Sequence, residues 1–158
     1  MSVKPSEIVS YLKSRGLKLS LAESLTGGMI ASGIVDVPGA SDIFEGSVVS
    51  YSDAVKMNVL GVSGETLDEH TAVSFECAVG MARGARKIMS SDIAVSVTGV
   101  AGPGPAYDGQ PQGTVFIGFS DKNGEGAVLK LFEGDRDEVR RQTRDAAYDL
   151  IMERALKL

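Results

Sequence analysis

Segments with the apolar spacing of a helix alternate with short strand-like segments along the whole chain. The spacing predicts five strands, at 17–21, 47–51, 93–97, 114–120 and 126–132. It also predicts five or six helices, the longest of them at 73–89 and 135–156. The turn DKNGEG joins the last two strands as a hairpin, so this pair is antiparallel. We therefore expect an α/β fold, a three-layer α/β/α sandwich whose mixed, mostly parallel central sheet has about five strands.

Residues suited to helix ends mark several of these boundaries. Ser6, Ser52 and Asp135 stand where an N-cap side chain accepts a backbone N–H. Gly16 stands where a left-handed residue can end the first helix. No Ser/Gly/Pro-rich linker and no repeat divides the chain, so we expect residues 1–158 to form one domain.

Charge and composition exclude several classes of function. The 16 Lys and Arg residues are outnumbered by 21 Asp and Glu residues, and this net charge of −5 disfavours binding to the nucleic-acid backbone. No apolar run reaches the roughly 18–20 residues that span a bilayer, and charges interrupt the N-terminus where a signal peptide is apolar. The single cysteine, Cys77, cannot form an internal disulfide. We expect a cytoplasmic protein that binds neither nucleic acid nor membrane.

One histidine and one cysteine leave few routes to metal or thiol chemistry. A zinc site needs several such ligands, and a Ser-His-Asp triad would have to use His70, which ends a short predicted helix. Cys77 shares a helical stripe with Met81 and Ala85, which favours a buried structural thiol over a nucleophile. We therefore expect neither a metal site nor a cysteine nucleophile.

Glycine is enriched, with 19 residues or about 12% against an average near 7%, and two glycine clusters follow strands. The first, AESLTGG at 22–28, stands where a strand ends and a helix begins. Such a junction offers unpaired helix N–H groups, so it can bind a phosphate or place Ser24 beside donors for an oxyanion. The alternative is an N-cap followed by glycines, Gly27 and Gly28, that permit tight packing of the helix on the sheet.

The second cluster, TGVAGPGP at 98–105, does not have the glycine spacing of a Rossmann fingerprint or the Gly-Lys-Ser/Thr of a P-loop. Long Gly/Pro loops at strand ends of α/β sheets commonly hold ligands. Tyr107, beyond the cluster, is a candidate wall for a flat ring. An ordinary surface loop is the alternative.

Lys56, between the two clusters, is a candidate general base. It stands one turn into a predicted helix and is bordered by Val55 and Val59. A lysine near apolar surface has its pKa lowered from about 10.4. Because no histidine is spare, a Ser-Lys pair is the remaining way to activate a serine here. A solvated helical lysine is the alternative.

The segments AESLTGG, YSDAVK, TGVAGPGP and GDRDEVRRQT, in this order, resemble the CinA C-terminal domain family over nearly the whole chain. That family includes nicotinamide-nucleotide amidases, which hydrolyse nicotinamide mononucleotide to nicotinate mononucleotide and ammonia. The resemblance implies a compact α/β/α domain and a serine amidase with a Ser-Lys centre that needs neither metal nor organic cofactor. A small pyridine nucleotide is then the expected partner, and we expect a homo-oligomer.

Carried onto this chain, the resemblance makes Ser24 the nucleophile, Lys56 its general base and Tyr51 a relay in the same hydrogen-bond network. It implies that the oxyanion and substrate side is formed by residues of both glycine clusters: Thr26, Gly27, Gly28, Thr98, Gly99, Gly102 and Gly104.

This chain departs from many members of the family at two positions, with Leu25 in place of Cys and Asp53 in place of Asn. We expect Leu25 to change packing alone. The carboxylate of Asp53 favours the protonated amine of Lys56 and so weakens it as a base. Longer members carry an N-terminal domain associated with nucleotide pyrophosphatase activity, which we do not expect because this chain begins at the amidase-like region.

Two arginines at the start of the last helix are candidates to hold the phosphate of such a nucleotide. On a helical wheel Arg136 and Arg140 fall on or beside the inward stripe, whereas Arg141 points away. The alternative is a solvated face beside acidic neighbours, with the phosphate held by the glycine loops.

Two other functions use the same features. In a non-catalytic nucleotide-binding module the glycine loops hold a ligand and Lys56 pairs with its phosphate. In a structural protein the glycines serve packing alone. The GxxxG pair Gly80 and Gly84 permits close helix packing, either within the chain or between subunits.

Overall fold

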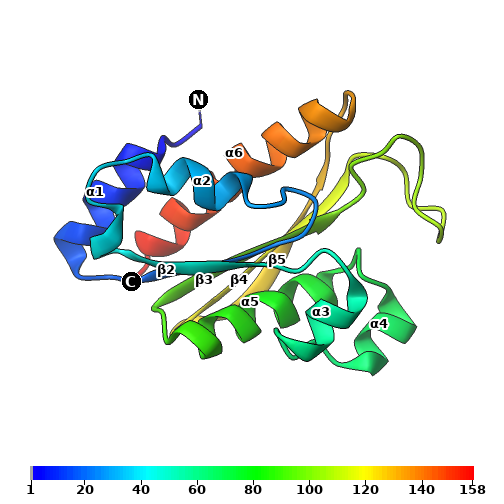
Figure 1. Cartoon of the computed structure of the whole chain (residues 1–158), viewed down its shortest axis with the longest axis horizontal. Helices are drawn as coiled ribbons and strands as arrows, with labels where there is room; N and C mark the ends of the chain where they lie inside the picture. The colour runs from blue at the N-terminus through cyan, green and yellow to red at the C-terminus, as the bar shows by residue number, and fades with distance from the viewer. Residues whose placement is uncertain (1) are drawn as a thin grey trace.

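A five-stranded sheet forms the centre of the structure, a computed structural model that describes residues 2–158 (Figure 1). Its spatial order is β2-β1-β3-β4-β5. The strands are β1 (Leu19–Glu23), β2 (Phe44–Val49), β3 (Ile93–Gly99), β4 (Thr114–Asp121) and β5 (Gly124–Leu131). β1 pairs in parallel with β2 and β3, and the pairs β3–β4 and β4–β5 are antiparallel, so only β4 runs against the others. The predicted mixed, mostly parallel sheet is confirmed.

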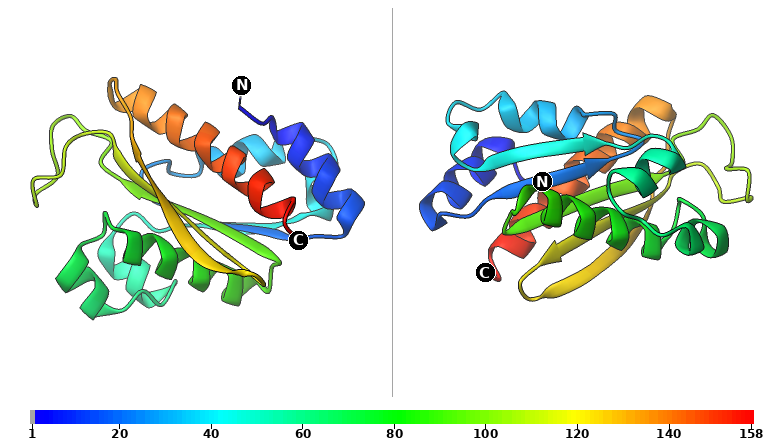
Figure 2. Two further views of the ribbon diagram at one scale, coloured as in Figure 1. Left: turned by 180° about the vertical axis from the view of Figure 1, so that it is seen from behind. Right: turned by 60° about the horizontal axis from the view of Figure 1, so that its bottom comes forward.

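Helices cover both faces of this sheet, which gives the predicted three layers (Figures 1 and 2). On one face lie α1 (Pro5–Arg15), α2 (Met29–Val35) and α6 (Arg136–Ala155). On the other lie α3 (Asp53–Asn58), α4 (Gly64–His70) and α5 (Phe75–Met89). Each face has its own apolar core, the larger under α1, α2 and α6 and the smaller under α5. A 3-10 turn, Ala40–Asp42, precedes β2.

The topology brings distant segments together at one edge of the sheet. From β1 the chain crosses to β2 on one side, and after α5 it returns to β3 on the other side of β1. The carboxyl ends of β1 and β3 therefore lie side by side at the point where the strand order reverses. In open α/β sheets this is where ligands bind.

Several predicted boundaries are shifted by local hydrogen bonding. β1 begins at Leu19 rather than at residue 17, because the N–H of Leu17 closes the end of α1 on Leu12 O at 3.0 Å. β2 begins at Phe44 rather than at residue 47, because Phe44 and Gly46 already pair with Leu19 and Ser20 of β1. The pairing register shifts by one residue between these two pairs. The predicted cap Ser6 is wrong, because Lys4 is the N-cap of α1. Ser52 and Asp135 are confirmed as N-caps.

The GxxxG pair on α5 is used inside the chain. A Cβ on Gly84 would lie 1.9 Å from Leu60 O, and one on Gly80 would lie 3.4 Å from Val62 Cγ2. These glycines therefore let α5 approach the segment after α3, which explains the motif without a second subunit.

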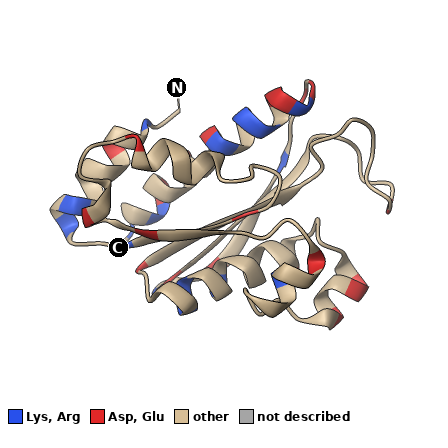
Figure 3. Cartoon of the chain, viewed as in Figure 1, with Lys and Arg blue, Asp and Glu red and all other residues tan. Residues whose placement is uncertain are grey.

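Acidic and basic residues are mixed along α6 rather than gathered on one continuous face (Figure 3). None of the helices in residues 2–158 has the length and apolar character needed to cross a membrane.

Candidate active site

Ser24 stands directly after β1, at the predicted junction between strand and helix. Residues 24–28 form a turn that leads into α2, and Gly27 (φ 59°) and Gly28 (φ 103°) have left-handed backbone angles that favour glycine. The side chain of Ser24 is largely buried and reaches a pocket at the carboxyl end of the sheet. The predicted position of Ser24 between a strand and a helix is confirmed.

Lys56 approaches Ser24 from α3. Ser52 caps this helix by accepting the N–H of Val55 at 3.2 Å, and the cap places Lys56 one turn into the helix. The Lys56 side chain is 1% exposed, and its Nζ lies 3.0 Å from Ser24 Oγ. The same Nζ donates to the carbonyl oxygens of Ser50 at 2.7 Å and Tyr51 at 3.2 Å. The predicted pairing of Ser24 with a buried lysine is present.

The three contacts of Lys56 Nζ fit both of its protonation states. As an ammonium it donates to Ser24 Oγ and to the two carbonyl oxygens, and as a neutral amine it donates to the two carbonyl oxygens while its lone pair accepts the hydroxyl of Ser24. Burial lowers the pKa of Lys56 below its usual range, while Cys77 and then Asp53 act in the opposite direction and raise it. This geometry lets Lys56 remove the proton of Ser24.

Glu23, which the sequence reasoning did not single out, organises the turn that carries Ser24. Its carboxylate is fully buried and accepts five hydrogen bonds of 2.7–3.1 Å. The donors are the hydroxyls of Thr26 and Ser47 and the N–H groups of Gly28, Ile30 and Ala31. A carboxylate just before a helix N-terminus is favoured by the helix dipole, which is the one sequence signal that pointed to it.

The contacts of Glu23 change the expected source of oxyanion donors. The hydroxyl of Thr26 and the N–H of Gly28 point to Glu23, and the N–H of Gly27 donates to Ser24 O at 3.1 Å. These groups are therefore not available to an oxyanion, contrary to the sequence expectation. Within residues 2–158 no hydrogen bond uses the backbone N–H of Leu25 or Thr26, which leaves these two as the candidate donors beside Ser24.

The two arginines of α6 have different positions. Arg140 is half-buried and donates to Leu25 O at 2.8 Å and Thr26 O at 3.1 Å, so it holds the Ser24 turn rather than an open anion site. Arg136 is exposed and lines the pocket, where it donates to Gly102 O and to the Tyr51 hydroxyl. Of the two arginines, Arg136 is therefore the one that lines the pocket.

The phenol of Tyr51 does not lie between Ser24 and Lys56. Its side chain is 64% exposed, and its hydroxyl is bonded by Arg136 Nη2 at 3.3 Å. Tyr51 contributes its backbone carbonyl to Lys56 instead. The expected phenol relay is corrected to a carbonyl acceptor, because the end of β2 turns the ring outward to the pocket mouth.

The second glycine cluster contributes in part. Thr98 is buried, donates to Ala72 O at 2.7 Å and lines the pocket with Gly99. Gly102 contributes the carbonyl that binds Arg136. Gly104 does not line the pocket, since its N–H is held by Gln112 Oε1 at 2.8 Å on the projecting loop (Figure 1). Tyr107 on the same loop is 86% exposed and forms no wall of the pocket.

The pocket has a volume of about 230 Å³, below the range of roughly 300–1,000 Å³ that encloses drug-sized ligands. It is lined by Ser24, Leu25, Tyr51, Asp53, Lys56, Ala72, Val73, Thr98, Gly99, Ala101 and Arg136. Ser24, Lys56 and Arg136 thus face the same small pocket.

His70 and Cys77 lie outside the pocket lining. His70 ends α4, with its Nδ1 3.7 Å from Glu76 Oε2. Cys77 is buried, and burial raises the pKa of its thiol to about 11, as the structural interpretation requires. Throughout residues 2–158, no three His, Cys, Asp or Glu side chains gather as metal ligands would.

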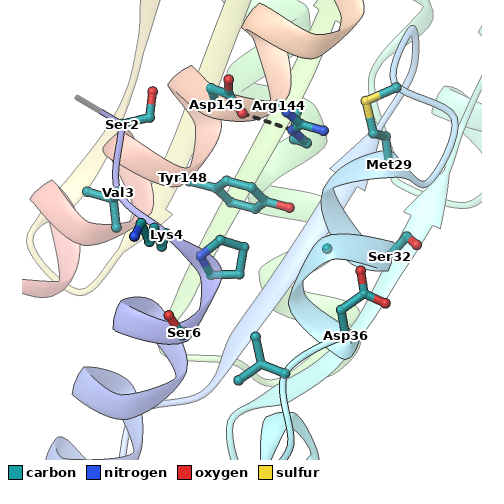
Figure 4. Close-up of a pocket in the computed structure, with 13 residues that line it drawn as sticks. Ser2, Val3, Lys4, Ser6, Met29, Ser32, Asp36, Arg144, Asp145 and Tyr148 are labelled. Atoms are coloured by element: carbon teal, nitrogen blue, oxygen red, sulfur yellow. Dashed lines mark hydrogen bonds and ion pairs between the residues drawn. The ribbon is translucent and has the colours of Figure 1, made fainter.

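A larger hollow, of about 610 Å³, lies between the N-terminal segment, α2 and α6 (Figure 4). Arg144 Nε there lies 2.9 Å from Asp145 Oδ1, and the Tyr148 hydroxyl donates to Ile30 O. Its lining residues do not include Ser24 or Lys56. Pocket size alone therefore does not identify the candidate site, and the contact between Ser24 and Lys56 distinguishes the smaller pocket.

Comparison with known proteins identifies a family. The sequence model of the CinA C-terminal domain matches residues 3–155. A CinA-like protein of Fervidobacterium nodosum is 41% identical over 150 residues, covering 95% of this chain and 37% of that protein. A CinA-like protein of Geotalea uraniireducens is 45% identical over 151 residues, covering 96% and 36%. The crystal structure of a Competence-Damaged Protein (CinA) superfamily protein of Klebsiella pneumoniae aligns with TM-score 0.94 at 32% identity, over 98% of this chain and 96% of that one.

This chain thus spans about a third of the length of the curated relatives that it matches. Their names state no reaction, so the chemistry has to be argued from the site.

Proposed function

This chain belongs to the CinA C-terminal domain family, and we propose that it hydrolyses the carboxamide of nicotinamide mononucleotide to nicotinate mononucleotide and ammonia. The observation that carries the proposal is the buried Lys56 Nζ, which lies 3.0 Å from Ser24 Oγ and also donates to two backbone carbonyl groups. Such a pair activates a hydroxyl in a chain that has one exposed histidine and a thiol of raised pKa.

In the proposed reaction Ser24 Oγ attacks the carboxamide carbon as its proton passes to Lys56 Nζ. The N–H groups of Leu25 and Thr26 donate to the oxyanion, a contribution of several kcal/mol in related enzymes. The C–N bond then breaks, and Lys56 returns the proton to the leaving nitrogen, which departs as ammonia. Water attacks the acyl-enzyme with Lys56 again as base, and the acid and the free Ser24 hydroxyl are released.

Glu23 and Arg140 hold the reacting groups in place. Glu23 fixes the Ser24 turn by accepting hydrogen bonds from N–H groups at the start of α2. Arg140, on α6, fixes the same turn by donating to two of its carbonyl groups. The catalytic contacts are thereby set before substrate arrives, which lowers the cost of ordering them.

The direct test is release of ammonia from nicotinamide mononucleotide by the purified chain, with nicotinate mononucleotide identified as the second product. A rise in melting temperature with this nucleotide but no product would support a non-catalytic binding module instead. If the chain yields no product and shows no thermal shift, both functions are contradicted.

The two arginines provide a matched pair of variants. Arg136→Ala is expected to raise KM for nicotinamide mononucleotide about ten- to a hundredfold and to leave KM for the riboside, which lacks the phosphate, nearly unchanged. Arg140→Ala is expected to lower kcat for both substrates alike, because Arg140 supports the Ser24 turn. Equal effects of Arg136→Ala on the two substrates would place the phosphate elsewhere.

The pH dependence of the rate reports the base. We expect kcat/KM to rise with pH and to level off above the pKa of Lys56, so that the midpoint of the rise reports this pKa. Burial places it below the usual 10.5. Because Asp53 raises the pKa of Lys56, Asp53→Asn is expected to move the midpoint of this rise to lower pH. A pH–rate titration of both proteins checks this, and a midpoint that stays or moves upward refutes the coupling.

A further inference from the structure

Asp53 is the only carboxylate among the residues that line the pocket. The other charged lining residues, Lys56 and Arg136, carry positive charge when protonated. Asp53 is the first residue of α3, a six-residue helix that also carries Lys56. The pocket therefore presents a negative group on α3 and a positive group on α6.

The carboxylate of Asp53 is free to meet a ligand. It is exposed, and within residues 2–158 it takes part in no ion pair and accepts no side-chain hydrogen bond. Glu23, the nearest other carboxylate in sequence, is fully buried and engaged by five donors. An approaching cation can therefore be attracted by Asp53 and by no other acidic group of the pocket lining.

The carboxylate of Asp53 opposes the proposed catalysis by Lys56, unless the same carboxylate contributes to substrate binding. Asp53 raises the pKa of Lys56 and so reduces the fraction of neutral base. A ring that carries a permanent positive charge changes this balance. Arg136 repels such a ring and Asp53 attracts it, and the ring's charge beside Lys56 favours the neutral amine.

We propose that Asp53 is a specificity-determining residue, which recognises the positive charge of an N-substituted pyridinium ring while Arg136 meets the negative end of the same molecule. This proposal rests on the proposed amidase function, whose substrate has a cationic ring and a distal phosphate, and it assigns recognition of the ring charge to Asp53. It predicts discrimination against the same nucleotide with its ring reduced to the neutral 1,4-dihydropyridine.

A purely structural role for Asp53 makes a different prediction. An acidic residue in the first turn of a helix is favoured by the helix dipole. On that account Asp53→Asn lowers stability slightly and changes the binding of charged and neutral rings equally.

The experiment measures binding without turnover, in the Ser24→Ala background, by titration calorimetry. The two ligands are oxidised and reduced nicotinamide mononucleotide, which share ribose and phosphate and differ in ring charge. With Asp53 present we expect the oxidised form to bind more tightly. Adding Asp53→Asn is expected to weaken the oxidised form roughly five- to twentyfold and the reduced form less than twofold, and Asp53→Glu to restore most of the loss.

Glu65→Gln is the matched control, because Glu65 is an exposed acidic residue in the first turn of α4 and does not line the pocket. It is expected to leave the affinities for both forms unchanged. Equal weakening of both forms by Asp53→Asn, or no change in either, overturns the role of Asp53 while leaving the amidase proposal intact. A folded Ser24→Ala protein that binds neither form contradicts the proposed function itself.

Discussion

Ser24→Ala is expected to reduce ammonia release from nicotinamide mononucleotide by roughly a thousandfold or more, because the variant retains the pocket but has no hydroxyl to form the acyl-enzyme. The Ser24 side chain makes one hydrogen bond in the folded chain, to Lys56, and the turn around it is held by Glu23 and Arg140. The melting temperature is therefore expected to change by only a few degrees. Activity and thermal melting are measured on the same preparation.

A second buried serine provides the matched control. Ser96 lies on β3, is fully buried and donates to Ala78 O, and it does not line the pocket. Ser96→Ala is expected to keep most of the turnover at a similar or greater cost in stability. If a folded Ser24→Ala protein retains turnover within tenfold of the unmodified chain, Ser24 is not the nucleophile.

Short-range sequence signals place Ser24 and Lys56 separately, and the resemblance to the CinA C-terminal domain family implied their pairing. A strand followed by two glycines places Ser24 at a turn, and Ser52 fixes where α3 begins and hence the direction of Lys56. The parallel order of β2, β1 and β3 then brings these ends to one edge. Periodicity and helix caps thus predict the two positions, and the contact between them follows from the resemblance and the fold.

The residues that were missed or misplaced depend on packing between distant segments. Glu23 reads as an ordinary charged residue, and only the fold shows that the first turn of α2 closes over it. The contact of Arg140 with Leu25 spans 115 residues, so a helical wheel indicates that Arg140 faces inward and cannot name its partner. Gly104 looked like part of a ligand loop, and its role is fixed by a hydrogen bond to Gln112 on the returning segment.

Side-chain direction at a strand end is also set by tertiary context. Tyr51 follows β2, and the family resemblance implied that its phenol is a relay in the hydrogen-bond network of Ser24 and Lys56. The carbonyl groups of Ser50 and Tyr51 are drawn to Lys56 Nζ, and the Tyr51 ring lies outward within reach of Arg136. A backbone group thus occupies the place that the sequence assigned to a phenol.

Lys56→Arg is expected to be as inactive as Lys56→Met, with turnover at least about a hundredfold below that of the unmodified chain. A guanidinium stays protonated at any usable pH, so it keeps the positive charge of a lysine but cannot accept the proton of Ser24. If positive charge were the contribution of Lys56, arginine would retain activity that methionine loses. Steady-state ammonia release by the two variants separates these roles.

Lys56→Met also gives a readout that does not depend on substrate, namely the pH dependence of stability. Burial lowers the pKa of Lys56 in the folded chain, whereas the unfolded chain keeps the usual value of 10.5. Between these two values the unfolded chain binds more protons, so the free energy of unfolding rises with pH across that window. Lys56→Met removes this rise, and urea titrations at several pH values measure its loss. A pH dependence of stability that is identical in the two proteins would mean that Lys56 titrates normally, and Lys56 would then lack the neutral form that the proposed base requires.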